Sequence, residues 1–497
     1  MDNIVNLIKE PWQEGWHEKA RQVFEDFLKN GERYYKKAVD SLQIRCNKQN
    51  PNNKNEVPYL ALINENNPAS GPYGGMSFVV FPTLGSPCLF GMVVGTQGLA
   101  PDEKILGRPG HARKIGAVCQ WLNNEYAENE RIAWAKYDPC RTEKENELIN
   151  EPLSVNAENG ADEYQPILDK YGHVLYGMCH GGRMSEEAIE KALKAFLDLM
   201  LQERGVNLLK SAQEDANDIE RNYLAYLFPS ISTSGLMELL KDRRYVILEG
   251  PPGTGKTEMA LEILEDYYQG SGNSIQFHPN VTYEEFIGGL KPVKTNDGVG
   301  FAFEAEPGTL MKAAAEAEEK NFLLHIDEIN RADLPKVLGE SIFLFEPNAI
   351  HERSITLPHH FGKAHGNTLR LPKSLCVLGT MNTADRSIAI LDIAIRRRFA
   401  FVKLWPQMNV VEEHGCSLNK DAFRRLLNIF VEYAPEEAFN LIPGHGYFTE
   451  KDEAKAKNRL KTELKPLLEE YLEQGYVAGF SDIIRDYLNW LDVACKS

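Results

Sequence analysis

The sequence lacks the features of membrane-spanning, secreted and disulfide-bonded proteins. No run of about 18 apolar residues occurs, so no membrane-spanning helix is expected. The first residues lack a basic region followed by an apolar one, and we therefore expect no secretory signal. The eight cysteines are scattered without a Cys-x-x-Cys pair, which argues against a disulfide framework and a zinc ribbon. A reduced, cytoplasmic protein with no membrane partner is the expectation.

The chain also has fewer basic than acidic residues. The chain has 55 Lys and Arg against 72 Asp and Glu, which gives a formal net charge of −17. The protein as a whole is therefore not drawn to nucleic acid, and any contact with DNA has to come from a local basic surface. Apolar residues make up 43% of the 497 residues. This share is enough for packed cores, and the length predicts about three domains of ~150 residues each.

The first part of the chain reads as a separate α+β domain over residues 1–205. Residues 1–45 carry apolar residues at helical spacing, and a further helix is expected at Ser185–Glu203. A polar, acidic stretch at 141–163 is expected to be a loop. Between these parts, Gly and Pro separate three strand-like runs, which are Tyr59–Ile63, Met76–Phe81 and Leu89–Val94. Dense charge at Asp215–Arg221 reads as a connector, so we expect a linker over 206–225.

Arg108–Lys114 is the densest basic cluster of the first half and has two readings. It could meet the phosphates of DNA or RNA, or it could be the solvated start of a helix with Pro109 in its first turn. The aromatic residues that follow could stack on bases, although such spacing is more often that of a core. They are Trp121, Tyr126, Trp134 and Tyr137.

The second half of the chain begins with a sequence typical of a phosphate-binding loop. A short apolar run, Tyr245–Leu248, precedes it, and apolar residues at helical spacing follow it. The segment fits the pattern G-x-x-x-x-G-K-[ST] at every fixed position. Its glycines let backbone N–H groups turn toward phosphate oxygens, while the lysine contacts the β- and γ-phosphates and the last hydroxyl ligands Mg²⁺. The residues are Gly250, Pro251, Pro252, Gly253, Thr254, Gly255, Lys256 and Thr257.

Two carboxylates end a later apolar strand, Phe322–Ile326. Asp327 is expected to hold Mg²⁺ directly or through water, and Glu328 to orient and polarise the attacking water. An Asp-Glu pair at a strand end is often a solvated turn. About 70 residues after a phosphate loop, however, it indicates a nucleotide site.

The next strand, Leu375–Thr380, leads into the sequence MNTADRS. Asn382 is expected to lie between the two earlier motifs and to hold the γ-phosphate or the lytic water. Asp385 assists there or caps the following helix.

Three arginines at 396–398 precede the last strand. They could be partners of a helix C-terminus, but phosphoryl transfer often uses a cation supplied by a neighbouring subunit. We favour Arg397 or Arg398 for that role, which implies a ring.

Five strands alternate with helical segments over residues 226–405, which predicts a parallel sheet with helices on both faces. The strands are 245–249, 274–278, 322–326, 375–380 and 399–404. From Trp405 onward the periodicity is helical only, so residues 406–497 are expected to form a helical lid. The fold class is therefore α/β for the second half, a phosphate-loop domain with a lid, preceded by the α+β domain.

Residues from about 245 to 475 resemble the AAA+ domain of the McrB family, the GTP-using subunits of methylation-dependent (type IV) restriction systems. The resemblance is carried by GPPGTGKT, by FHP with YEEFIGG, by IDEINRA, by MNTADRS with RRRF, and by GHGYF with LLEEY. It implies that Asn382 and Asp385 position the lytic water. It also implies hexameric rings, a McrC-like nuclease partner, and an N-terminal domain that selects the target. Gly446 departs from the family, where we expect Ser in the lid motif.

Two inserts fit the same group of AAA+ proteins. Lys291–Phe303 reads as a hairpin with its turn at Asn296–Gly298, and residues 349–373 read as another. The histidines of the second insert match no zinc pattern, and we expect them to face solvent or a pore. They are His351, His359, His360 and His365.

The main hypothesis is a Mg²⁺-dependent motor that hydrolyses GTP or ATP and translocates or remodels DNA, bound through the N-terminal domain or the pore, for a separate nuclease in antiviral restriction. No PD-(D/E)xK nuclease set is present, since Pro101–Lys104 has the wrong spacing, and no Asn-Lys-x-Asp guanine motif occurs. Two alternatives stay open. One is a MoxR-type ATPase that remodels a protein client, and the other is a nucleotide-gated binding module with negligible turnover.

Overall fold

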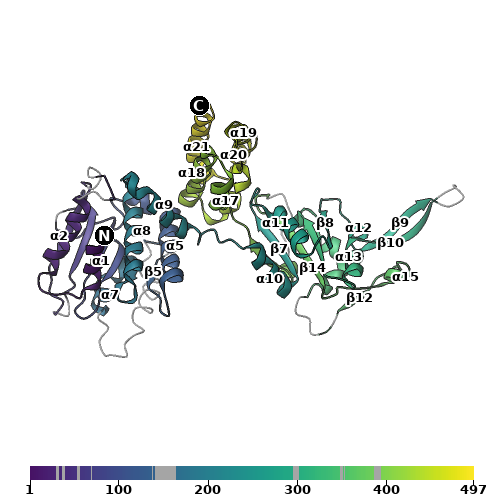
Figure 1. Cartoon of the computed structure of the whole chain (residues 1–497), viewed down its shortest axis with the longest axis horizontal. Helices are drawn as coiled ribbons and strands as arrows, with labels where there is room; N and C mark the ends of the chain where they lie inside the picture. Colours follow the sequence, from purple (N-terminus) through teal and green to yellow (C-terminus); the bar gives the residue numbers. More distant parts are fainter. Residues whose placement is uncertain are drawn as a thin grey trace. The chain divides into compact units, whose positions relative to one another are not determined.

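The computed structural model describes the chain except residues 30–32, 36–39, 53–55, 69, 137, 140–163, 295–300, 347–350, 352, 386–392 and 497. It divides into two compact units (Figure 1). One comprises Met1–Leu227 with Val431–Ala434, and the other comprises Phe228–Phe430 with Pro435–Ser497. No helix among the described residues is long and apolar enough to cross a membrane.

An antiparallel sheet forms the centre of the N-terminal unit. Its strand order is β1-β2-β3-β4-β6-β5, and each described pairing is antiparallel. The three strands predicted from sequence are β2, β3 and β4, and the α+β class is confirmed. The strands are β1 Leu42–Asn47, β2 Tyr59–Asn64, β3 Met76–Phe81, β4 Leu89–Val94, β5 Ala133–Ala135 and β6 Leu175–His180.

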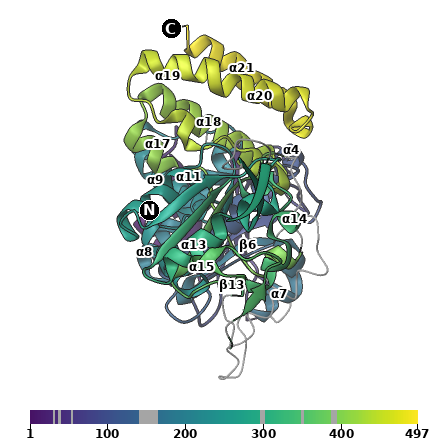
Figure 2. The ribbon, with the colours of Figure 1, turned by 90° about the vertical axis from the view of Figure 1, so that its right-hand side faces the viewer.

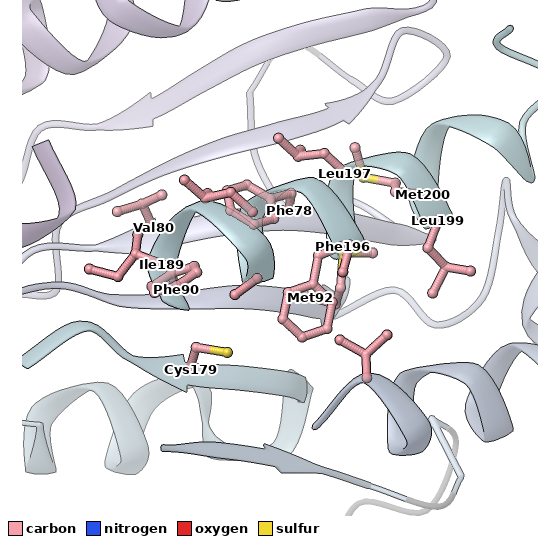
Figure 3. Close-up of a cluster of buried hydrophobic side chains, with 14 of the residues drawn as sticks. Phe78, Val80, Phe90, Met92, Cys179, Ile189, Phe196, Leu197, Leu199 and Met200 are labelled. Atoms are coloured by element: carbon pink, nitrogen blue, oxygen red, sulfur yellow. The ribbon is translucent and has the colours of Figure 1, made fainter. Parts of the chain in front are cut away.

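Most helices of this unit pack against one face of this sheet. Because side chains alternate along a strand, Phe78 and Val80 of β3 point to one face, where they meet Ile189 and Phe196 of α8 (Figure 3). Val79 points to the opposite face and a second, smaller core. The helices of the unit are α1 Asp2–Lys9, α2 Trp16–Lys29, α4 Glu103–Leu106, α5 Pro109–Tyr126, α7 Gln165–Tyr171, α8 Glu186–Gln202 and α9 Gln213–Leu224.

The basic cluster belongs to the start of a helix. Pro109 occupies the first turn of α5, while His111 and Lys114 are 0% and 5% exposed. Both side chains contact the carboxylate of Glu203. Because these two side chains are buried against an internal carboxylate, they are not available to a phosphate backbone. The prediction of a helix start is therefore confirmed, but the expected exposure to solvent is wrong for these two side chains.

Two further stretches of the N-terminal unit pack inward. Trp121 and Trp134 are 2% and 1% exposed, as expected of core aromatics, whereas Tyr137 lies outside the described residues. Helix α9 contributes Ala216, Ile219 and Tyr223 to the core. The stretch predicted to be a linker, 206–225, therefore contains a packed helix, and the division between the compact units falls after Leu227.

The second unit contains the predicted five-stranded parallel sheet, in the order β15-β7-β14-β11-β8. Every pairing in it is parallel. Because β14 lies between β7 and β11, the carboxyl ends of these three strands are neighbours. The strands are β7 Tyr245–Gly250, β8 Gly272–Gln276, β11 Phe322–Asp327, β14 Leu375–Asn382 and β15 Ala400–Lys403.

Helices cover both faces of this sheet, as predicted. Val246 and Leu248 of β7 pack with α10 and α11, and Tyr245 and Ile247 of the same strand pack on the opposite side with α13. The alternation follows from the two-residue period of a strand. The helices are α10 Thr233–Arg243, α11 Lys256–Glu262, α12 Tyr283–Phe286, α13 Thr309–Ala317, α14 Leu334–Leu338 and α16 Ile393–Arg396.

Both predicted inserts are hairpins. Strands β9 Gly288–Lys294 and β10 Phe301–Pro307 pair antiparallel, and the turn predicted at Asn296–Gly298 lies outside the described residues. Strands β12 Ser354–Thr356 and β13 Thr368–Arg370 form the second pair, with α15 Gly362–His365 between them. Within the described ranges, no group of three or more His, Cys, Asp or Glu side chains is placed to hold a metal ion.

Helices follow the sheet from Trp405 to the end of the described chain. Figure 2 shows α19, α20 and α21 as a helical layer, and apolar residues of these helices, among them Leu468, Leu488 and Leu491, are buried. The helices are α17 Met408–His414, α18 Ser417–Tyr433, α19 Glu453–Arg459, α20 Lys465–Glu473 and α21 Ser481–Ala494.

Candidate active site

The predicted phosphate loop connects β7 to α11. Gly253 and Gly255 both adopt φ of 77°, a left-handed conformation that glycine reaches without a steric penalty. Gly250 also admits no side chain, because a Cβ there would lie 2.2 Å from the carbonyl oxygen of Leu404. The glycines of the motif are therefore required by the path of the backbone.

The Lys256 side chain folds back over its own loop. Its Nζ donates to the carbonyl oxygens of Gly250 at 3.0 Å and Pro251 at 2.7 Å. Burial lowers the lysine pKa to about 8, although the nearby carboxylates of Glu328 and Asp327 act in the opposite direction. A desolvated ammonium held by carbonyl dipoles is suited to pair with an entering phosphate.

A hydroxyl and a carboxylate meet beside the loop. Thr257 Oγ1 donates to Asp327 Oδ1 at 3.0 Å, and the Thr380 hydroxyl donates to the same oxygen. Hydroxyl and carboxylate oxygens are the protein ligands that Mg²⁺ accepts alongside water and substrate phosphates. Thr257 and Asp327 therefore fit the metal role predicted for them. Thr380 was not foreseen, because a threonine inside a strand carries no signal of its own.

Glu328 has an unusual backbone conformation. Its φ of 51° is left-handed, which is uncommon for a residue other than glycine and is associated with functional sites. Its carboxylate lies 3.2 Å from Arg331 Nε, and Arg331 Nη2 lies 3.6 Å from the carboxylate of Asp385. Arg331 thus links the two predicted carboxylates, a role that the sequence did not indicate.

Asn382 lies at the same edge of the sheet as the loop. It is the register partner of Gly250 across β14 and β7, and the next residue, Thr383, donates its backbone N–H to Gly250 O at 3.1 Å. The Asn382 Oδ1 accepts from Ala384 N at 3.1 Å. The sheet therefore brings the side chains of the three predicted motifs to one edge.

The three arginines differ in exposure. Arg396 and Arg397 are both exposed, and the Arg396 guanidinium lies over the Phe401 ring, 5.1 Å from its centroid. Arg398 is only 7% exposed, and its Nη1 donates to Ala394 O at 2.9 Å. Of the two arginines favoured from sequence, Arg397 is the one that solvent reaches.

The lid motif contacts the loop directly. Gly444 N donates to Pro252 O and Gly446 N donates to Gly253 O, each at 2.8 Å. A Cβ on Gly446 would lie 3.0 Å from Gly253 O, so the glycine at this departure from the family pattern permits the close approach. A cavity of about 660 Å³ adjoins these contacts and is lined by Gly253, Gly255, Glu258, Val410, His414, His445, Gly446, Thr449, Glu450 and Lys451.

Comparisons with known proteins agree with this geometry. Residues 245–399 match the family model of the AAA domain (dynein-related subfamily). The type IV methyl-directed restriction enzyme EcoKMcrB subunit of Escherichia coli K12 is 32% identical over 272 residues, 49% of this chain and 57% of that protein. The type II restriction enzyme BsuMI component YdiS of Bacillus subtilis 168 is 29% identical over 191 residues, 31% of this chain and 55% of that protein.

The chain thus spans little more than half the length of these curated relatives. The Thermotoga maritima RuvB Holliday junction branch migration motor is 18% identical, and the match covers 52% of this chain and 66% of the motor chain. The TM-score is 0.21, and no argument is based on this likeness. The range matched by the family model contains the motifs at the sheet edge. Residues 245–399 match an AAA domain, and over about half of its length the chain is similar to a McrB subunit of a restriction enzyme.

Proposed function

We propose that the chain is a Mg²⁺-dependent nucleoside triphosphatase, acting on GTP or ATP, that serves a restriction system. The observation that supports this function is the meeting of three motifs at one edge of the sheet. The loop of β7, Asp327 at the end of β11 and Asn382 at the end of β14 are neighbours through the strand order. Parallel sheets commonly bind ligands at this edge.

Each residue then has a role in hydrolysis. Loop N–H groups and Lys256 bind the phosphates, and Thr257 and Asp327 would hold Mg²⁺, which neutralises charge on the phosphates when it is bound. Glu328 accepts a proton from the attacking water. Asn382 orients that water, and Asp385 supports the arrangement through Arg331.

A homo-oligomeric ring, hexameric in the family that the chain resembles, would complete the site. Charge that develops on the transferred phosphoryl group needs a cation, and Arg397 is exposed shortly before strand β15. A neighbouring subunit's Arg397 would supply this cation in trans. Arg398, which is buried and bonded to its own helix, is the weaker candidate.

The proposed partner is a separate nuclease of the McrC type. Both curated relatives are named as parts of restriction enzymes. The segment Pro101–Lys104, which has the wrong spacing for a nuclease motif, contains Asp102, and the Asp102 side chain makes internal contacts. It accepts from Arg204 Nη2 at 2.7 Å and from Met76 N at 2.9 Å.

DNA is the proposed target, and the N-terminal unit offers a place for a base. A cavity of about 280 Å³ is lined by aromatic side chains and one arginine. The Arg45 guanidinium lies over the Tyr73 ring, 5.4 Å from its centroid, while Tyr59 and Tyr171 meet edge to face. Aromatic walls of this kind hold an extruded base by stacking. The lining aromatics are Tyr59, Tyr73, Phe81 and Tyr171.

The proposal is tested by measuring phosphate release from GTP and ATP, with and without Mg²⁺, DNA and a McrC-type nuclease. The Glu328→Gln variant should bind nucleotide like the wild type and lose turnover by ~10²-fold or more. Failure of the wild-type protein to bind or cleave any nucleoside triphosphate would contradict the function. Stimulation by a protein client in place of DNA would favour the MoxR-type alternative.

A further inference from the structure

His445 is held against the phosphate loop from both sides. The residue before it, Gly444, donates its N–H to Pro252 O, and the residue after it, Gly446, donates to Gly253 O. A Cβ on Gly444 would lie 2.1 Å from backbone atoms of Gly253, so the two segments are in direct backbone contact. The position of His445 relative to the loop is thereby fixed.

The orientation of the His445 ring is also fixed. The backbone N–H of Gln407 donates to Nδ1 at 3.1 Å. Because Nδ1 accepts, the proton of the neutral ring is on Nε2. Burial lowers the His445 pKa to about 4, and Lys256 acts in the same direction. The ring is therefore a neutral donor whose only N–H is at Nε2.

The Nε2 atom faces the loop. It lies 3.6 Å from the position that a Cβ on Gly255 would occupy, and both residues line the cavity of about 660 Å³. Gly255 immediately precedes Lys256, in the part of the loop whose backbone surrounds the phosphates in proteins with this motif. A donor at this position therefore lies beside the phosphate chain of a bound nucleotide.

We propose that His445 binds the nucleotide by donating its Nε2–H to a non-bridging phosphate oxygen in the part that di- and triphosphates share. The inference rests on the proposed function, because it assumes that a nucleotide occupies the loop. A neutral donor suits a site that already contains the ammonium of Lys256, since a second buried cation would be repelled by the first. The hydrogen bond from His445 would thus connect the lid to a nucleotide bound in the loop.

The test compares two variants of similar size that differ in one hydrogen-bond donor. His445→Gln retains an N–H near the original Nε2, whereas His445→Met has none. Binding of fluorescent guanosine and adenosine di- and triphosphates is measured by titration on the full chain. A hydrogen bond to a charged group predicts ~10-fold weaker binding of both di- and triphosphate to His445→Met, and binding within ~3-fold of wild type to His445→Gln.

The remaining outcomes separate this inference from the proposed function. Equal affinities of the Gln and Met variants would overturn the role of His445, and so would a loss confined to the triphosphate. Absence of binding by the wild type would instead overturn the proposed function. His365→Ala is the control, because this histidine lies on α15 and does not line the cavity. It should leave both affinities unchanged.

Discussion

Thr257 and Asp327, 70 positions apart in the chain, are joined by a hydrogen bond of 3.0 Å between a hydroxyl and a carboxylate oxygen. The bond joins the helix that follows the phosphate loop to the end of β11. Both side chains are proposed ligands of one Mg²⁺, and the hydrogen bond holds them close together. Thr257 and Asp327 would therefore need little reorganisation to hold Mg²⁺.

Replacing Asp327 by Asn should separate metal binding from nucleotide binding. The amide keeps the shape of the side chain but removes its charge, so Mg²⁺ should no longer strengthen nucleotide binding and turnover should fall by ~10²-fold or more. Titration of nucleotide with Mg²⁺ and with EDTA measures this. Asp492→Asn removes a carboxylate that pairs with Lys465 in the lid, and it should change neither quantity. A Mg²⁺ effect of wild-type size in Asp327→Asn would exclude this residue as a ligand.

Replacing Gly444 by Ala should damage the contact between lid and loop. The new Cβ would lie 2.1 Å from backbone atoms of Gly253, and relief of such a clash costs ~1–3 kcal/mol. We expect weaker nucleotide binding together with a lower unfolding temperature. Gly479→Ala in the lid is the matched control, because a Cβ there meets nothing within 4 Å. If the two variants behave alike in binding, the contact has no role in holding nucleotide.

Nucleotide binding should take up a proton above about pH 8. In the empty loop the Lys256 pKa is lowered to about 8 by burial, and anionic phosphates will raise it again. The bound state therefore holds more protons on Lys256 than the empty state at pH 8.5, and affinity should decrease as pH rises through 8.

Calorimetry of nucleotide binding in buffers of different ionisation enthalpy measures this uptake. At pH 6.5 Lys256 is already charged in both states, so its contribution should disappear. A binding enthalpy that does not depend on the buffer at pH 8.5 would contradict the expected protonation.

Mixing two inactive variants should restore turnover if Arg397 acts between subunits. Arg397→Ala keeps a complete loop, and Lys256→Ala keeps the arginine. In mixed rings an intact loop can face an intact Arg397. We expect phosphate release from the mixture to exceed that of either variant alone. The control is Arg396→Ala, because Arg396 lies over the Phe401 ring. This variant should be active without being mixed with a second variant. No recovery on mixing would argue against a role in trans.

Replacing Tyr59 by Leu should weaken DNA binding and leave basal nucleotide turnover unchanged. The leucine keeps the N-terminal cavity apolar but removes one stacking surface, which is worth ~1–3 kcal/mol for each base. Duplexes with and without methylated bases, titrated by fluorescence anisotropy, measure the change. Tyr35→Leu alters a tyrosine that is 47% exposed in the same unit and should bind normally. Equal loss in both variants would remove the argument for a base in this cavity.

The sequence predicted those parts of the molecule that depend on local pattern. Alternating strands and helices gave the parallel sheet, and fixed motif spacing placed Lys256, Asp327 and Asn382 at its edge. What it could not predict are contacts between distant backbones. The bonds from Gly444 and Gly446 to the loop involve no characteristic side chain, and the tie between Arg331 and Asp385 depends on how two loops meet. The sequence also could not decide whether the basic cluster at Arg108–Lys114 contacts nucleic acid or begins a helix. The burial of Lys114 against Glu203 favours the helix start.

The central position of β14 has a consequence for how this chain is made. Strands β7 and β11 are synthesised well before β14, yet neither pairs with the other, since β14 separates them. Until the ribosome has delivered residues 375–382, the nascent chain presents two apolar strands with open hydrogen-bonding edges, which invite association with other chains. Shielding of this half-built sheet during translation is therefore a requirement of the topology itself.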